Sequence, residues 1–179
     1  MAGRASKLLH CVFVQPKIPG NTGTTGRTCL ALDAQLHLVG PLGFSLDDPH
    51  VKRSGLDYWP HVQPAYHEDW DACRADLEQR LGVRNFLFFT THATEDLGSL
   101  RLLQGAPFEI PSDLSCACVF GSETAGLLSL LPPDRCANQR LVRLPMLSEC
   151  IRSLNLAVSA GIGLWEVFRQ QQLLLQEIS

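Results

Sequence analysis

The sequence predicts an α/β domain with a mainly parallel sheet and helices on both faces. Short apolar runs alternate with longer helical patterns along the whole chain, as is typical of α/β folds. The 179 residues suffice for one domain with a sizeable core, and 45% of them are hydrophobic, as in globular proteins. We therefore expect one domain over residues 1–179.

The first elements are read from apolar runs and the residues that bound them. Residues 8–14 are almost entirely apolar, which predicts a buried strand. A helix is expected over 21–34, with Asn21 or Thr22 as its N-cap. A short strand over 35–41 ends in a Gly-Pro turn, and the loop-rich stretch after it contains a short helix around 48–54.

The middle of the chain repeats this alternation. An amphipathic pattern over 66–82 stops at a glycine and predicts a helix. Apolar runs predict strands over 84–91 and 114–121, separated by a polar linker. After the second of them we expect a turn and a short helix that Pro132 ends, and then a strand over 139–145.

The last predicted element, residues 153–179, is a long helix that is apolar nearly all round from Leu154 to Phe168. A helix without a polar face must be covered on both sides. It is therefore either a central core helix or a helix at a subunit interface, and we favour the interface. The charged fraction of 18%, below the typical value of about 25%, also favours an oligomer.

Charge and cysteine content narrow the class of protein. The net charge of −3 does not indicate nucleic-acid binding, although binding follows local patches rather than the sum. The seven cysteines include no C-x-x-C pair, which favours free thiols in a reduced compartment and argues against zinc. No signal peptide and no membrane-spanning apolar run are expected. The expected location is the cytoplasm, with an organelle as the alternative.

The stretch "IPGNTGTTGR" follows the first strand and looks at first like a phosphate-binding loop. However, no lysine follows its glycines, and their spacing of three does not match G-x-G-x-x-G. Two later stretches, "FGSETAGL" and "LPMLSECIRSLNLAVSAGI", also follow predicted strands. Open α/β sheets bind ligands at the carboxyl ends of their strands, so we expect all three stretches to form one site.

Together the three stretches resemble the SPOUT methyltransferases, in the branch that methylates RNA ribose 2′-hydroxyls. The first motif of that branch, N-x-x-x-x-x-R, is matched from Asn21 to Arg27. Its other two motifs, G-x-E-x-x-G-L and a P-M loop leading to S-L-N, are matched by Gly121, Glu123, Gly126 and Leu127, and by Pro145, Met146, Ser153, Leu154 and Asn155. "KRSGLDYW" and "RLPMLSECIRSLNL" most resemble the small cytidine/uridine 2′-O-methyltransferases of tRNA nucleotide 34. The chain departs from the pattern at Ala157, where relatives often carry serine.

This resemblance covers residues 8–169 and implies a trefoil knot over about 85–165. The knot would be formed by the loops at 89–94, 120–127 and 144–153 and would hold S-adenosylmethionine in a bent shape, without a metal. Such relatives are homodimers with the site at the subunit interface, which agrees with the interface interpretation of the final helix.

The implied activity is S-adenosylmethionine-dependent 2′-O-methylation of the wobble nucleotide in the tRNA anticodon loop. The catalytic residues implied are Arg27, Asn21, Glu123, Ser153 and Asn155. The cofactor-binding residues implied are Phe89, Thr90, Gly121, Glu123, Leu144, Met146, Leu147 and Ser153.

Two of these residues have competing interpretations. Arg27 would contact the RNA and either assist removal of the 2′-hydroxyl proton or orient the ribose and stabilise its developing alkoxide. Glu123 would position Arg27 or a backbone amide, or would simply be an acid at a helix N-terminus. Asn21 and Ser153 are also candidate helix caps.

Contacts with RNA are expected from basic residues around the site. The candidates are Arg27, Lys52, Arg53 and Arg152, followed by Lys17 and Arg143. Tyr58 and Trp59 could stack on an unpaired base or be half-buried packing residues. Two alternative functions remain open: an enzyme of this fold acting on rRNA or another tRNA position, and a non-catalytic RNA-binding module.

Overall fold

The computed structural model describes residues 7–47, 58–101, 114–131 and 140–178. Within them, one seven-stranded sheet has the order β3-β2-β1-β6-β4-β7-β5, and every neighbouring pair is parallel. The strands are β1 (Leu9–Val14), β2 (Gln35–Val39), β3 (Ala65–His67), β4 (Asn85–Phe89), β5 (Glu95–Asp96), β6 (Cys116–Phe120) and β7 (Arg140–Arg143). The predicted fold class is confirmed.

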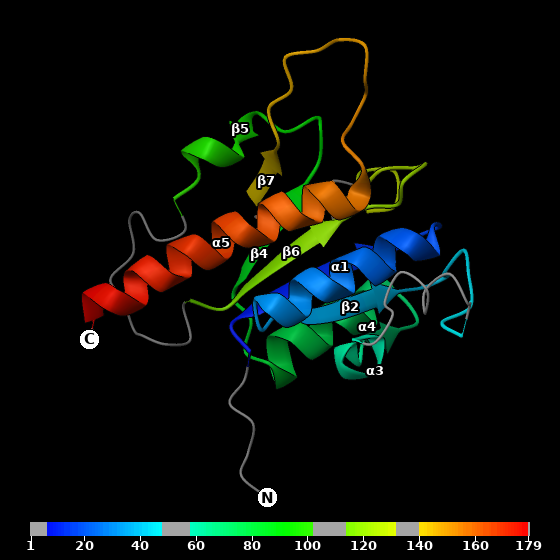
Figure 1. Cartoon of the computed structure of the whole chain (residues 1–179), viewed down its shortest axis with the longest axis horizontal. Coiled ribbons are helices and arrows are strands. Elements are labelled where there is room, and N and C mark those ends of the chain that lie inside the picture. The colour runs from blue at the N-terminus through cyan, green and yellow to red at the C-terminus, as the bar shows by residue number, and fades with distance from the viewer. Residues whose placement is uncertain (1–6, 48–57, 102–113, 132–139, 179) are drawn as a thin grey trace, which may run out of the picture.

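Helices cover both faces of the sheet (Figure 1). They are α1 (Pro19–Ala31), α3 (Trp59–Val62), α4 (Trp70–Ala75), the π-helical turn η1 (Asp76–Arg80), the 3₁₀ turn η2 (Leu97–Ser99) and α5 (Leu156–Ile178). The helices α1 and α5 pack together over one face, whereas α4 and η1 cover the other. The backbone N–H and C=O groups buried between these layers belong to helices and strands, where they are hydrogen-bonded.

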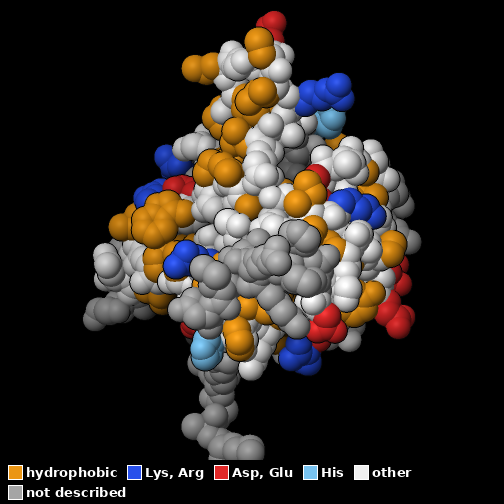
Figure 2. All heavy atoms as spheres, turned by 45° about the vertical axis from the view of Figure 1, so that its right-hand side comes forward, with side chains coloured by type: hydrophobic (Ala, Val, Ile, Leu, Met, Phe, Trp, Pro, Cys, Tyr) orange, Lys and Arg blue, Asp and Glu red, His pale blue; other side chains and the backbone are white. Residues whose placement is uncertain are grey.

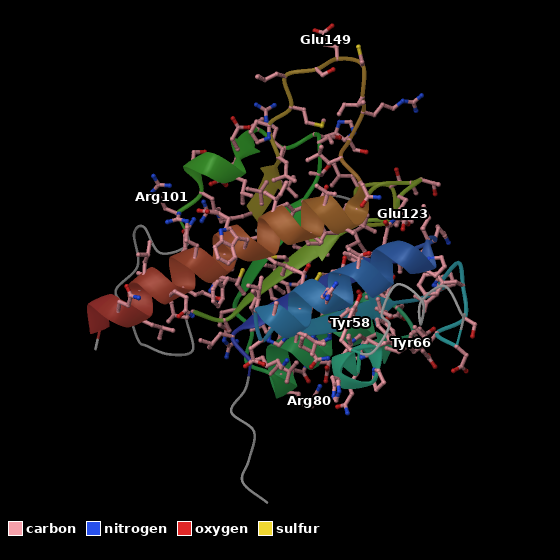
Figure 3. The ribbon with its side chains drawn as sticks, in the orientation of Figure 1. Tyr58, Tyr66, Arg80, Arg101, Glu123 and Glu149 are labelled. Carbon is pink, nitrogen blue, oxygen red and sulfur yellow. The ribbon has the colours of Figure 1, made fainter. Side chains whose placement is uncertain are left out.

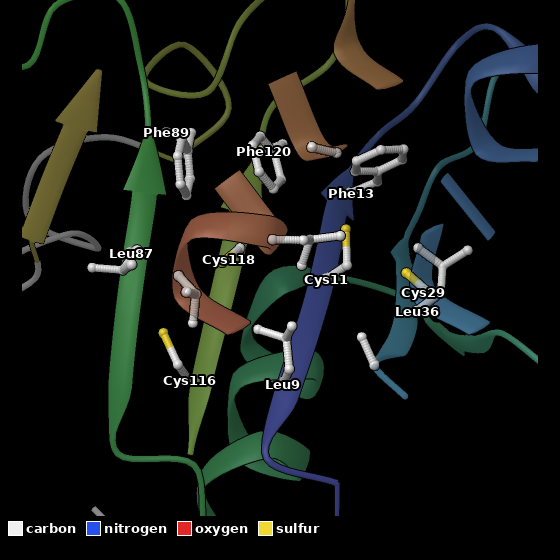
Figure 4. Close-up of a cluster of buried hydrophobic side chains, with 14 of the residues drawn as sticks. Leu9, Cys11, Phe13, Cys29, Leu36, Leu87, Phe89, Cys116, Cys118 and Phe120 are labelled. Atoms are coloured by element: carbon white, nitrogen blue, oxygen red, sulfur yellow. The ribbon is translucent and has the colours of Figure 1, made fainter. Parts of the chain in front are cut away.

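Successive side chains of the central strands point to opposite faces of the sheet, and they form the two halves of the core. In β1, Leu9, Cys11 and Phe13 point towards α1 and α5 (Figure 4), while Val12 and Val14 point towards α4. Both sets are buried, which is why the strand is apolar except for the buried His10. The cysteines of the described segments are free thiols, and all of them except Cys150 are buried.

The helix α5 is covered on one side only. Ala160, Leu164 and Val167 are fully buried against the sheet and α1. On the opposite side Ile162 and Trp165 are exposed, Trp165 to 57%. The core therefore accounts for one face of this apolar helix and leaves the other without cover within the described chain.

Four details differ from the elements predicted. The predicted helix over 66–82 starts later, because its first residues pair with β2 as the edge strand β3. Asp69 then caps α4 by accepting from the amide of Ala72 at 2.9 Å. Residues 122–131 form turns rather than a short helix. The supposed polar linker contains β5 and η2. The helix α1 begins at Pro19 instead of at Asn21 or Thr22, and Ile18 in the cap position supplies no side-chain hydrogen bond.

Several expectations concerning the fold stay predictions. The short helix around 48–54 lies outside the described residues. The trefoil knot and the single-domain boundary stay predictions. Among the helices of the described segments, none is both long and apolar enough to span a membrane.

Candidate active site

A cavity of about 760 Å³ opens at the carboxyl ends of the strands. Its walls come from the segment after β4, the loop after β6, the loop between β7 and α5, and the first turn of α1. In Figure 1 the loop before α5 projects at the top, and the loop after β6 lies beside it. The size is within the usual range of about 300–1,000 Å³ for small-molecule and cofactor sites.

Aromatic stacking forms one wall of this cavity. The rings of Phe89 and Phe120, the last residues of β4 and β6, stack with centroids 4.4 Å apart. Gly163 of α5 lies directly over them, since a Cβ at this position would be 2.7 Å from Phe89. The missing side chain lets α5 approach the stacked rings closely.

The carboxylate of Glu123 connects the loop after β6 to the start of α1 (Figure 3). It accepts hydrogen bonds from the backbone amides of Lys17 at 2.8 Å and Ile18 at 3.1 Å, and from Asn21 Nδ2 at 2.8 Å. The two amides precede α1 and have no intrahelical partner. Glu123 therefore caps this helix from a segment about a hundred residues away in the sequence.

The side-chain amide of Asn155 extends this hydrogen-bond network from Asn21 to α5. Asn155 Nδ2 donates to Asn21 Oδ1 at 3.0 Å, and Asn155 Oδ1 accepts from the amides of Ala157 at 2.9 Å and Val158 at 3.3 Å. Asn155 is thus the N-cap of α5. The Glu123 carboxylate can only accept from Asn21, and the α5 backbone amides can only donate to Asn155. These two ends fix which atom of each side-chain amide is oxygen and which is nitrogen.

The row Glu123–Asn21–Asn155 holds together one residue from each of the three sequence stretches. It fixes the loop after β6, the start of α1 and the start of α5 relative to one another. All three residues line the cavity. A ligand in the cavity would therefore meet walls whose relative positions are already fixed.

We expect Glu123→Gln to lower the free energy of unfolding by about 1–3 kcal/mol, because the new amide would face donors that now share a carboxylate. Urea denaturation, with an unchanged m-value, measures the loss. Glu149→Gln is the matched control: Glu149 is exposed at the tip of the loop before α5 (Figure 3), so we expect a change within about 0.5 kcal/mol. Equal stability of the two variants would contradict this capping role.

The structure brings most of the sequence-predicted site residues together. Those lining the cavity are Asn21, Phe89, Thr90, Gly121, Glu123, Leu144, Met146, Arg152, Ser153 and Asn155. Leu147 does not line it: its side chain is fully exposed, because it lies on the projecting part of the loop before α5. That projection carries hydrophobic side chains at the top of Figure 2. Lys52 and Arg53 lie outside the described residues.

Arg27 also lies away from the cavity wall, on the exposed side of α1. Its guanidinium sits 5.1 Å from the centroid of the Tyr58 ring, a cation–π distance. The Tyr58 hydroxyl donates to the carbonyl oxygen of Gly23 at 3.3 Å, which fixes the ring against α1. Tyr58 thus orients Arg27, and Glu123 does not contact it.

Other basic and aromatic candidates have structural partners. Arg143 forms an ion pair with Asp96, across β7 and β5. Trp59 packs against the core beside Gly26 of α1. Lys17 contributes its backbone amide to the Glu123 cap, whereas Arg152 is exposed at the cavity rim.

The sequence did not reveal the partners of Glu123 or the role of Tyr58. The "KRSGLDYW" stretch singled out Tyr58, but nothing in its spacing indicates a contact with Arg27. In the same way, Ser153 and Asn155 are both good capping residues, and only the helix start at Leu156 decides for Asn155.

Comparison with known proteins identifies a family and named relatives of this chain. The model of the SpoU rRNA Methylase family matches residues 8–165. A tRNA (cytidine(34)-2′-O)-methyltransferase of Methylovorus glucosotrophus is 40% identical over 163 residues, which cover 91% of this chain and 96% of the relative. An enzyme of the same name from Burkholderia pseudomallei is 43% identical over 163 residues, with the same coverage of 91% and 96%.

Solved structures share the fold. One, described as giving structural insights into the 2-OH methylation of C/U34 on tRNA, has a TM-score of 0.75 at 37% identity and covers 92% of this chain and 96% of its own. The SpoU methyltransferase AviRb from Streptomyces viridochromogenes, in complex with AdoMet, has a TM-score of 0.76 at 23% identity, over 95% of this chain and 63% of its own. The family model and the relatives each cover about nine-tenths of this sequence, so the chain belongs to the SpoU methylase family.

Proposed function

We propose that this protein transfers a methyl group from S-adenosylmethionine to the ribose 2′-hydroxyl of nucleotide 34 in the tRNA anticodon loop. The observation that carries the proposal is the hydrogen-bonded row Glu123–Asn21–Asn155 at the mouth of the cavity. Each member belongs to a different motif of the methyltransferase pattern. The named activity of relatives at about 40% identity supports the substrate.

The cavity suits a cofactor that has an apolar part and several polar edges. Phe89 and Leu144 provide apolar surface, while Thr90 and the loop after β6 provide hydroxyl and backbone groups. S-adenosylmethionine, when bound, supplies an electrophilic methyl group. We assign its binding to Phe89, Thr90, Gly121, Leu144 and Met146, with Ser153 at the rim.

The task of the protein is to present a ribose hydroxyl in line with that methyl group. Arg152 and Ser153 stand at the cavity rim, where an RNA backbone would enter. Arg27, held by Tyr58, offers a fixed positive charge that would stabilise the oxygen as it loses its proton. Asn21 and Asn155 keep the walls in register while Glu123 remains bound to backbone amides.

We also propose that two copies associate through α5. Val158, Ile162 and Trp165 share one face of the helix at spacings of four and three residues, and all three are exposed. Pairing would cover this face, and we propose that Arg27, which does not line the cavity of its own copy, then serves the cavity of the other. Light scattering should give a dimer at micromolar concentration, and Ile162→Glu should give a monomer. A monomeric wild-type protein would contradict the proposal.

The contact between Arg27 and Tyr58 leads to a graded prediction. Tyr58→Leu removes the ring under the guanidinium and should lower kcat for methyl transfer about 2- to 5-fold, since an exposed cation–π contact is worth about 0.5–1 kcal/mol. Tyr58→Phe keeps the ring and should stay near the wild-type rate. A merely structural role for Tyr58 would instead lower stability in both variants without separating their kcat values.

Methylation of total tRNA with labelled S-adenosylmethionine tests the function directly. We expect labelled 2′-O-methyl nucleotide at position 34 only, located by mass spectrometry of nuclease fragments. Label at another tRNA position, or in ribosomal RNA supplied in a parallel reaction, would replace the substrate but keep the chemistry. Absence of label with intact cofactor binding would favour a non-catalytic RNA-binding module. A reduced compartment such as the cytoplasm stays the expected location.

A further inference from the structure

Three histidines form a hydrogen-bonded row across β1, β2 and β3, on the face of the sheet that α4 covers. His10 Nδ1 lies 3.1 Å from His37 Nε2, and His37 Nδ1 lies 3.0 Å from His67 Nε2. His10 and His37 are buried, whereas His67 is half-buried. None of the three lines the cavity described above. They are the polar exception in an otherwise apolar half of the core.

The contact of His10 with the backbone of Lys7 sets the direction of the hydrogen bonds in this row. His10 Nε2 lies 2.9 Å from the carbonyl oxygen of Lys7, which can only accept. His10 therefore carries its proton on Nε2 and accepts at Nδ1 from His37 Nε2. By the same logic His37 Nδ1 is an acceptor and points its lone pair at His67. Burial lowers the pKa of His37 to about 3, so this ring is neutral at neutral pH.

A thiol completes the group. Cys73 on α4 is buried, and one ligand atom from each of His37, His67 and Cys73 lies within 4.8 Å of the other two. The helix widens into the π-helical turn η1 at Asp76, within one turn of Cys73. Such turns are rare and often occur at functional sites. Asp76, at the start of η1, faces the group while it is paired with Arg80.

We propose that His37, His67 and Cys73 bind a zinc ion. Two imidazole nitrogens and one thiolate are the donor types that zinc prefers, and a tetrahedral site needs N–N and N–S separations of about 3.3–3.8 Å. The three ligand atoms lie within 4.8 Å of one another, so binding requires their side chains to adjust to these separations. The ion takes the place of the hydrogen bond between His37 and His67, and a water molecule on the half-buried side completes the coordination.

The surroundings of His37 are already those of a metal ligand. A coordinating histidine usually donates its second ring N–H to a fixed acceptor, which orients the ring. Here His37 Nε2 donates to His10, and His10 donates in turn to the Lys7 carbonyl oxygen. This relay holds the His37 lone pair towards Cys73 and His67. The sequence alone argued against zinc because the three ligands come from β2, β3 and α4, at spacings that match no ligand motif.

The experiment uses the full chain, stripped with a chelator under a thiol-free reductant and titrated with Zn²⁺ and then with Co²⁺. We expect one equivalent of tightly bound Zn²⁺, a higher melting temperature, and a Co²⁺ spectrum with a thiolate charge-transfer band. Cys73→Ser should remove that band and weaken Zn²⁺ binding by at least about 10²-fold. His67→Gln, at a half-buried position, should weaken it similarly.

Matched controls separate this site from adventitious binding. Cys150→Ser and His61→Gln change an exposed thiol and an exposed imidazole, and both should bind Zn²⁺ like the wild-type protein. Binding that survives in both Cys73→Ser and His67→Gln, or that disappears in the controls, would overturn the proposal. So would the absence of stoichiometric Zn²⁺. Cofactor affinity of the stripped protein should stay unchanged, so the outcome is independent of the proposed methyl transfer.

Discussion

Replacing Arg27 with alanine should lower methyl transfer to tRNA by about 10²–10⁴-fold and leave the affinity for S-adenosylmethionine nearly unchanged. The range is that of losing one acid–base or oxyanion-stabilising group. Binding should survive because Arg27 does not line the cavity and forms no part of the Glu123–Asn21–Asn155 row. Calorimetry for the cofactor and single-turnover kinetics for the transfer measure the two quantities separately.

The melting temperature provides the structural control for this variant. Arg27 is exposed, and the contact with Tyr58 is worth at most about 1 kcal/mol at such a site, so the stability should change little. Arg84→Ala is a matched control, since Arg84 is an exposed arginine just before β4, at the opposite end of the strand from the cavity. Its transfer rate should equal that of the wild type.

A conservative variant distinguishes two roles of Arg27. Arg27→Lys keeps the charge but loses the planar group that stacks on Tyr58 and contacts phosphate and ribose in a fixed geometry. Partial recovery of the rate would indicate that the charge of Arg27 dominates its role. No recovery would indicate that its main role is to orient the ribose and phosphate. A fully active Arg27→Ala would make the arginine a surface residue. A joint fall in cofactor affinity and rate would move Arg27 to the cofactor site.

The central sheet was predictable because its strands are buried on both faces. The runs ending in Val14, Phe89 and Phe120 are almost entirely apolar, and each became a strand with only its ends displaced. The edge strands carry weaker signals. Tyr66 and His67 in β3 fit a helical pattern as well, and only pairing with β2 decides their conformation. The two residues of β5 are too few for any periodicity.

Within the site, the sequence predicted which residues take part but not which hydrogen-bond partners they have. The three motifs identify Asn21, Glu123 and Asn155, and their common location follows from the parallel sheet, whose strands end on one side. The specific contacts depend on loop paths. The carboxylate of Glu123 caps α1 only because the loop after β6 folds back over Pro19 and its neighbours. The placement of Leu147 outside the cavity likewise follows from the course of the loop before α5.

The cap of Glu123 depends in turn on a close backbone approach at Gly121. A Cβ on Gly121 would lie 2.2 Å from the amide nitrogen of Leu127 and 2.3 Å from the carbonyl carbon of Gly126. These are backbone atoms, so no side-chain rotation relieves the clash. The loop is also closed by a hydrogen bond from the Gly126 amide to the Ser122 carbonyl oxygen, at 3.0 Å. An added methyl group must therefore displace the whole turn, and Glu123 with it.

We expect Gly121→Ala to lower the free energy of unfolding by about 3 kcal/mol, the upper part of the usual range for overpacking. A displacement of about 1 Å at the cavity wall should also lower methyl transfer by about 10²-fold. Unlike Arg27→Ala, this variant should lose cofactor affinity as well, because Gly121 lines the cavity. Gly98→Ala is the control, since nothing lies within 4 Å of a Cβ there. If Gly121→Ala unfolds and binds the cofactor like Gly98→Ala, the loop is free to move and the wall of the cavity is not fixed by this contact.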